Sequence, residues 1–179
     1  ARAEPGKIAF ATGGVGSGMH LVAVILQART GIQMNHIPYK GGNALNLALI
    51  SGEVPVLFTS VAGITPFIES GKMRLLAVTS KQRYAPLPNV PTVAETLLPD
   101  FDVRAWYALA GPKRLPAPIV SKLNAAVHAA LNRRDFADKL LFLGAQPWPT
   151  SPPDAQEFLA SEVARWTKLI LDEKIQVVN

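Results

Sequence analysis

The 179-residue chain carries 18 lysines and arginines against 13 aspartates and glutamates, and its 49% hydrophobic and 17% charged residues are typical of a globular protein. It contains no cysteine, which excludes disulfides, thiolate nucleophiles and cysteine-based zinc sites, and no apolar run reaches the roughly 18 residues that span a membrane. The net charge is +5, but no run of consecutive basic residues is longer than two. This dispersed positive charge favours small anions over nucleic acid as partners.

The first predicted elements are a strand, a glycine-rich turn and a helix. Residues 7–11 predict a short buried strand, residues 12–18 include four glycines, and an apolar helix runs from Ser17 to about residue 28 before Gly31 ends it. Glycines let the backbone approach a ligand closely, and the first N–H groups of a helix have no partner within it. With Ser17 as its N-cap, this segment is predicted to form a cradle for an anion.

The residues around the turn argue against nucleotides. A dinucleotide fingerprint needs glycines at positions 14, 16 and 19, but position 19 is Met19. A phosphate-binding loop laid over Gly13 and Gly18 has Met19 and His20 in place of the Lys and Ser or Thr that contact phosphate and magnesium. A small carboxylate needs only backbone donors and a hydroxyl. The segment is therefore either a carboxylate site or a tight turn without a ligand.

Further strand–turn–helix units follow in the first hundred residues. The expected elements are strands over residues 34–39, 54–59 and 73–79, a glycine turn over 40–42, a helix over 43–50 and a short helix from about 60 to 69. Such alternation favours a parallel sheet flanked by helices with right-handed crossovers. Residues 80–100 contain four prolines and are expected to carry only a short helix, near residues 92–97.

The remainder of the chain is predicted to be mainly helical. Residues 101–110 predict a strand that crosses between two lobes, and helices follow from 116 to about 131, over 135–143 and over 153–172. These helices have wide apolar faces, and the residues after 104 supply at most two strands to cover them. We therefore expect part of this second lobe to be absent from the sequence. We also expect uncovered faces to promote dimerisation or segment exchange between copies.

The order of segments resembles the Bug family, the periplasmic solute-binding proteins of tripartite tricarboxylate transporters. The matching stretches include PGKIAFATGGVGSGMHL, HIPYKGG, SGEVPVLFTSV and, most specifically, GKMRLLAVTSKQRYAPLPNVPTVAET. The resemblance implies a bilobed α/β clamp of the type II periplasmic-binding-protein class. In that clamp, residues 1–103 are one complete lobe and residues 104–179 are the C-terminal part of the other. The N-terminal part of that lobe, with a signal peptide, is expected to precede this sequence.

The same resemblance implies a receptor without catalytic residues, cofactor or metal. Its expected partners are a small organic acid (a dicarboxylate, a tricarboxylate or an aromatic carboxylate) and the permease subunits of a membrane transporter. The family's second carboxylate loop corresponds to Gly13, Gly14, Val15, Gly16 and Ser17. His20, Thr59, Ser60 and Trp106 complete the expected ligand-binding residues.

For three of these residues the sequence supports a specific expectation. His20 is expected either to contact the ligand or to cap and pack the turn. The resemblance implies an Asp in many relatives where this chain has Thr59, which disfavours an amino acid as ligand. Trp106 is expected either to line the cleft or to pack at the hinge between the lobes.

Other functions remain open at this stage. His20, His36 and His128 lie far apart in the sequence, with no nucleophile elbow, paired acids or metal-ligand spacing near them, which argues against an enzyme. His128 is expected on the solvent side of its helix, and His36 is expected to be a satisfied strand residue. An effector-sensing domain of a transcription regulator uses a similar clamp and would need a DNA-binding motif upstream. A lobe whose turns bind nothing is the third possibility.

Overall fold

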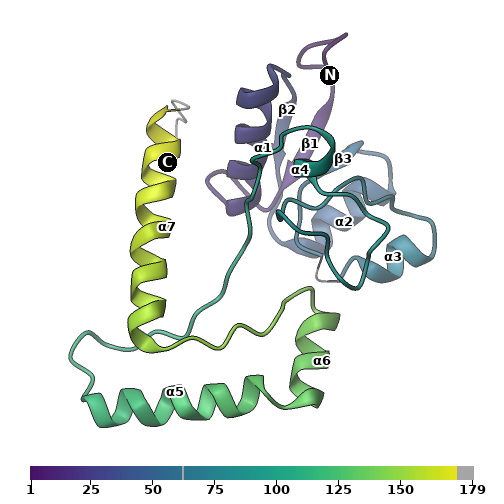
Figure 1. Ribbon diagram of the computed structural model, residues 1–179. Coiled ribbons are helices and arrows are strands. Elements are labelled where there is room, and N and C mark those ends of the chain that lie inside the picture. Colours follow the sequence, from purple (N-terminus) through teal and green to yellow (C-terminus); the bar gives the residue numbers. More distant parts are fainter. Residues whose placement is uncertain (62, 173–179) are drawn as a thin grey trace. The chain divides into compact units, whose positions relative to one another are not determined.

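The computed structural model describes residues 1–61 and 63–172. The described chain falls into two units, residues 1–105 and residues 106–172 (Figure 1). In neither range does a helix combine the length and the apolar character needed to cross a membrane. The assignment of the units as one whole lobe and part of another stays a prediction.

The first unit contains a three-stranded parallel sheet in the order β2-β1-β3 (Figure 1). The central strand is β1 (Ala9–Thr12), which pairs with β2 (Asn35–Pro38) along its whole length and with β3 (Val56–Leu57) at Phe10 and Ala11. Two helices connect these strands, α1 (Gly18–Thr30) and α2 (Gly42–Ile50). The predicted succession of strand–turn–helix units is therefore confirmed for this part of the chain.

The two faces of the sheet have different neighbours because side chains alternate along a strand. Ala11 packs in a buried cluster with Leu45 and Ala48 of α2, so α2 covers one face. Phe10 is on the other face, where its ring stacks on His36 of β2 at a centroid distance of 4.9 Å. The start of α1 lies on this second face, since the ring of His20 stacks on the same His36.

The predicted strands at residues 73–79 and 101–110 are wrong. The first segment contributes only an isolated bridge between Val78 and Thr92, and the second contains no strand. The two segments bond to neighbouring loops instead: the Val78 N–H donates to the Pro91 carbonyl, and the Val103 N–H donates to the Thr79 carbonyl. Each segment buries a valine, Val78 and Val103, whereas Leu76, Tyr107 and Leu109 are exposed. Burial alone does not make a ladder of strand hydrogen bonds.

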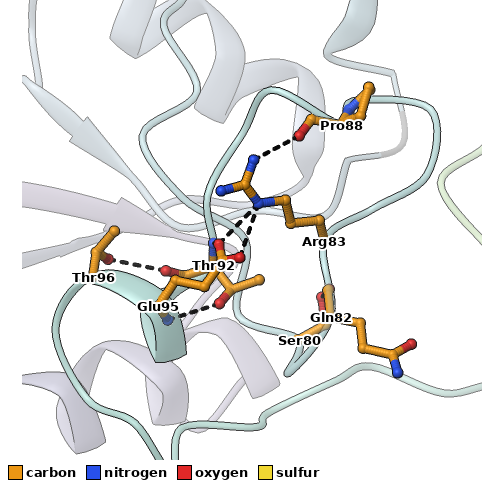
Figure 2. Close-up of polar contacts among 7 residues, drawn as sticks. All are labelled: Ser80, Gln82, Arg83, Pro88, Thr92, Glu95 and Thr96. Atoms are coloured by element: carbon orange, nitrogen blue, oxygen red, sulfur yellow. Dashed lines mark hydrogen bonds and ion pairs between the residues drawn. The ribbon is translucent and has the colours of Figure 1, made fainter.

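The proline-rich connection after residue 80 is held by side-chain hydrogen bonds (Figure 2). The Arg83 Nε lies 3.0 Å from each carboxylate oxygen of Glu95, and the same guanidinium donates to the Pro88 carbonyl at 2.9 Å. Glu95 also accepts from the backbone N–H of Thr92, whose hydroxyl accepts from the Glu95 N–H, forming a capping box on α4 (Val93–Thr96). Figure 2 shows these contacts tying both ends of the connection together.

Within the described residues, four further helices are α3 (Thr65–Glu69) in the first unit, and α5 (Ala117–Leu131), α6 (Arg134–Phe142) and α7 (Pro152–Asp172) in the second (Figure 1). Each begins and ends within a few residues of its predicted bounds, except that α3 starts later. Large apolar side chains of the second unit remain exposed, among them Ile119, Leu123, Phe136, Phe142, Leu159 and Val163. The expectation for His128 is wrong: it is half-buried, and its Nε2 lies 2.9 Å from the Thr150 carbonyl.

Candidate functional site

The glycine turn between β1 and α1 is fixed by its own hydrogen bonds. Ser17 is the N-cap of α1, as predicted, and its hydroxyl accepts from the His20 N–H at 3.3 Å. The Gly16 N–H donates to Nδ1 of His20 at 3.1 Å, and the Ser17 N–H donates to the Gly14 carbonyl at 3.3 Å. Gly14 and Gly16 have φ values of 128° and 76°, a region that disfavours residues with a side chain. The glycines are therefore required by the backbone of the turn.

These internal bonds use only some of the N–H groups of the turn. Besides the Gly16 and Ser17 bonds, the Gly14 N–H donates to the hydroxyl of Thr12 at 3.3 Å. Four N–H groups of the turn and first helical residues donate to no group in residues 1–61 and 63–172: those of Gly13, Val15, Gly18 and Met19. The surface above the turn is open, since a Cβ built on Gly13 or Gly14 meets no atom within 4 Å. The turn thus offers exposed backbone donors beside a helix N-terminus, which is the chemistry that binds an anion.

Two histidines, His20 and His36, contact residues of this turn and of the strand before it. The His20 and His36 rings stack with centroids 4.2 Å apart, and Nε2 of His36 lies 2.7 Å from the Thr12 hydroxyl. Burial lowers the pKa of both imidazoles below the ordinary 6.5, and the charge of His20 lowers the pKa of His36 further. Both rings are therefore mainly neutral near pH 7. The packing alternative for His20 and the satisfied strand position of His36 are confirmed, whereas ligand contact by His20 stays a prediction.

Thr59 and Ser60 follow β3 directly. The Phe58 N–H donates to the Ala11 carbonyl at 3.0 Å, which keeps the end of β3 beside β1. Because parallel neighbouring strands end at the same edge of a sheet, Thr59 and Ser60 leave the sheet at the edge where the glycine turn begins. Thr59 is half-buried and Ser60 is exposed. Their contact with a ligand stays a prediction.

Trp106 belongs to the second unit and packs there. Its indole N–H donates to a carboxylate oxygen of Glu162 at 3.1 Å, and its ring meets that of Phe158 edge-on at 5.6 Å. Glu162, only 8% exposed, also accepts from the Trp166 indole and from Arg165. Burial by itself raises the pKa of Glu162, but the hydrogen bonds from Arg165 and Trp106 hold it below its ordinary value. A place for Trp106 in the ligand cleft stays a prediction.

A family model described as the tripartite tricarboxylate transporter family receptor matches residues 1–175. The chain belongs to this receptor family. Curated relatives include a protein from the tcbD-tcbE intergenic region of Pseudomonas sp. strain P51, 35% identical over 98% of this chain, and protein BugT of Bordetella pertussis, 34% identical over 94%. The chain spans about half the length of these two relatives, 52% in each case.

Solved receptor structures share the fold. An R. palustris protein solved with adipate has a TM-score of 0.85 and 31% identity, covering 97% of this chain and 58% of its own. The periplasmic binding protein BugD has a TM-score of 0.81 and 28% identity, covering 98% of this chain and 59% of its own. MatC from Rhodopseudomonas palustris, solved with bound malate, has a TM-score of 0.74 and 28% identity, covering 92% of this chain and 57% of its own. The receptor family fold, a mixed α/β periplasmic-binding-protein fold with a parallel sheet, is thereby established for this chain.

Sequence reasoning missed the supporting layer of the site. Thr12 and His36 are 24 positions apart, and Trp106 and Glu162 are 56 apart, so no local spacing joins either pair. Strand alternation was the available signal for Thr12, because it places Thr12 on the same face as Phe10. Within the described ranges, no group of three or more His, Asp or Glu side chains has the arrangement of a metal site.

Proposed function

We propose that this chain is part of an extracytoplasmic receptor that captures a small organic carboxylate for a tripartite tricarboxylate-type transporter. The single observation that carries the proposal is the open glycine turn with unpaired N–H donors, found in a chain of the receptor family. Relatives solved with adipate and with malate support a carboxylate as the ligand class. From its membership of the receptor family we propose that the protein is periplasmic and that its macromolecular partners are the permease subunits of the transporter. The family match favours this function over an effector-sensing domain.

The geometry suits capture of an anion without chemistry on it. We propose that one bound anion is held by the unpaired N–H groups of the turn and helix start, by the Ser17 hydroxyl and by the positive end of the α1 dipole. Hydrogen bonds to a charged acceptor contribute about 1.5–3 kcal/mol each. A few of them, after the cost of immobilising the ligand, give micromolar affinity, about −8 kcal/mol. We propose that Thr59 and Ser60 add hydroxyl donors from the neighbouring strand end, and that no catalytic residue is involved.

A pair of glycine variants tests this assignment. Gly14→Val places a branched side chain over the donors of the turn, whereas Gly31→Val makes the same change at the far end of α1. Both glycines have positive φ, 128° and 67°, and in both a Cβ meets no atom within 4 Å, so each variant strains the backbone without a steric clash and Gly31→Val is the control for strain away from the turn. We expect wild type and Gly31→Val to bind adipate or malate in calorimetric titration, and Gly14→Val to lose binding while its circular dichroism matches that of Gly31→Val. Wild-type affinity in Gly14→Val would overturn the loop assignment.

A further inference from the structure

The two stacked imidazoles contact both sides of the glycine turn. On one side, Nδ1 of His20 receives the Gly16 N–H at 3.1 Å. On the other side, Nε2 of His36 lies 2.7 Å from the Thr12 hydroxyl, which in turn lies 3.2 Å from the Gly14 carbonyl. The turn is therefore attached at Gly16 and Gly14 to one pair of rings stacked 4.2 Å apart.

One arrangement of protons satisfies all of these contacts. His20 must be neutral and carry its proton on Nε2, because its Nδ1 accepts the Gly16 N–H. His36 donates through Nε2 to the Thr12 oxygen, and the Thr12 hydroxyl donates onward to the Gly14 carbonyl. The Thr12 oxygen also accepts the Gly14 N–H. His36 can keep this role when it is protonated, whereas His20 cannot, since imidazolium has no acceptor nitrogen.

We propose that His20, stacked on His36, is the positioning residue of the carboxylate loop and that protonation of its Nδ1 releases Gly16 and weakens carboxylate binding. The inference rests on the proposed function. The Gly16 N–H donates to His20, and this bond fixes the Val15–Gly16 peptide, which lies between the peptides that present the unpaired N–H groups of Val15 and Gly18. A proton on Nδ1 places two donors against each other, so the peptide must rotate and the set of donors above the turn is lost.

The surroundings of the rings set the direction of the pH effect. His36 is the titratable group that faces His20 from the sheet, while Phe10 and Thr12 beside it are uncharged. No Asp, Glu, Lys or Arg within the described ranges forms a hydrogen bond or an ion pair with either ring. Burial lowers the pKa of both histidines, so the neutral, loop-holding state persists at pH 7 and is lost on acidification.

The first test needs no ligand. In the ¹⁵N-labelled chain, we expect long-range imidazole spectra at neutral pH to show His20 as the Nε2–H tautomer. In a titration from about pH 7.5 down to about pH 5, the Gly16 amide resonance should shift with the same midpoint as His20, below the ordinary 6.5 because burial lowers the pKa of His20. His20→Asn, whose side-chain oxygen replaces the acceptor without titrating, should remove this transition. His128→Asn, a histidine of the second unit that bonds Thr150, should leave it unchanged. An Nδ1–H tautomer of His20, or a Gly16 amide insensitive to pH in wild type, would overturn the inference.

The second test measures affinity for adipate and malate in wild type and His20→Asn across the same pH range. The ratio of the two dissociation constants cancels the ionisation of the ligand, because both proteins meet the same ligand. We expect wild type to weaken relative to His20→Asn by up to about tenfold per pH unit below the His20 pKa, the limit for one proton excluded by binding. A constant ratio, or a wild-type affinity that rises on acidification, would overturn the inference while leaving the proposed function intact. If neither protein binds adipate or malate at any pH, the proposed function is overturned, and so is the proposed effect of His20 protonation on affinity. The amide titration would still decide whether His20 holds the Gly16 peptide.

Discussion

Ser17 has two separable contributions to the candidate site. As the N-cap of α1, its hydroxyl accepts the His20 N–H, which satisfies one of the donors left unpaired at a helix start. In the proposed function, the same hydroxyl also faces the ligand. The capping contribution is measured as a change in the free energy of unfolding, and the ligand contact as a change in affinity for the carboxylate. The two contributions can therefore be measured independently.

Ser17→Ala and Ser17→Gly distinguish these contributions. Both variants lack the hydroxyl, but loss of an N-cap to Ala costs about 1 kcal/mol, whereas Gly at the same position costs only a few tenths. We expect urea unfolding to show that difference and calorimetry with adipate or malate to show a similar loss of affinity in both, about tenfold for one hydrogen bond. Affinity that follows stability, with Ser17→Gly binding like wild type, would contradict a contact between the hydroxyl and the ligand.

Local signals at single residues predicted the turn but not what lies under it. Ser17 and Gly31 mark the start and the end of α1 as its N-cap and C-cap residues. Capping preferences depend only on residues close in the sequence, so both roles could be predicted from the sequence. The support from Thr12 and His36 depends on β1 and β2 lying in register, with Phe10 opposite His36 and Thr12 opposite Pro38. Register is a property of the folded sheet. The dual attachment of the turn therefore could not be predicted from spacing alone.

At the level of elements, helices were predicted better than strands. The limits of α1, α5 and α7 follow from caps, prolines and apolar spacing within the helix itself. A β-strand forms only where a neighbouring segment provides a series of backbone hydrogen bonds. Residues 73–79 form only the isolated bridge between Val78 and Thr92. The apolar residues of this segment are the same whether or not a partner strand is present, which is why the sequence predicted a strand there incorrectly.

The short helix α4 gives the proline-rich connection its most specific contacts. The carboxylate of Glu95 is shared between the Thr92 N–H and the Arg83 guanidinium (Figure 2). The hydrogen bond from Thr92 and that from Arg83 lower the pKa of Glu95 below its ordinary 4.5. A carboxyl with a lowered folded pKa adds stability that is present above its unfolded pKa and is lost as the pH falls through the folded value.

Glu95→Gln tests this pH dependence. Glutamine keeps the capping geometry but has no charge to titrate, so we expect wild type to be more stable than the variant at pH 6 and the difference to shrink below about pH 4.5. Urea unfolding at a series of pH values measures it. Glu69→Gln at the end of α3 is the control, since Glu69 forms no ion pair among the described residues. A difference between wild type and Glu95→Gln that does not change with pH would contradict the assigned role of the charge.

For the molecule as a whole, the two units contain different groups of the predicted functional residues. Residues 1–105 hold the glycine turn, the histidine pair and the strand ends with Thr59 and Ser60. Residues 106–172 hold Trp106 and the helices with exposed apolar side chains. Association of copies through those side chains stays a prediction. The chain spans about half of the length of the tcbD-tcbE region protein and of BugT.

The measurement that tests the central claim most directly is native mass spectrometry of the 179-residue chain with an equimolar mixture of adipate, malate and adipamide. Adipamide has the length of adipate without its charge, so it is the matched control for carboxylate recognition. We predict a one-to-one complex with adipate or malate, lost on denaturation, and no complex with adipamide. The same spectrum shows whether copies associate. A bare chain whose circular dichroism is that of the folded protein, or equal binding of adipamide, would contradict the proposal that the glycine turn captures a carboxylate.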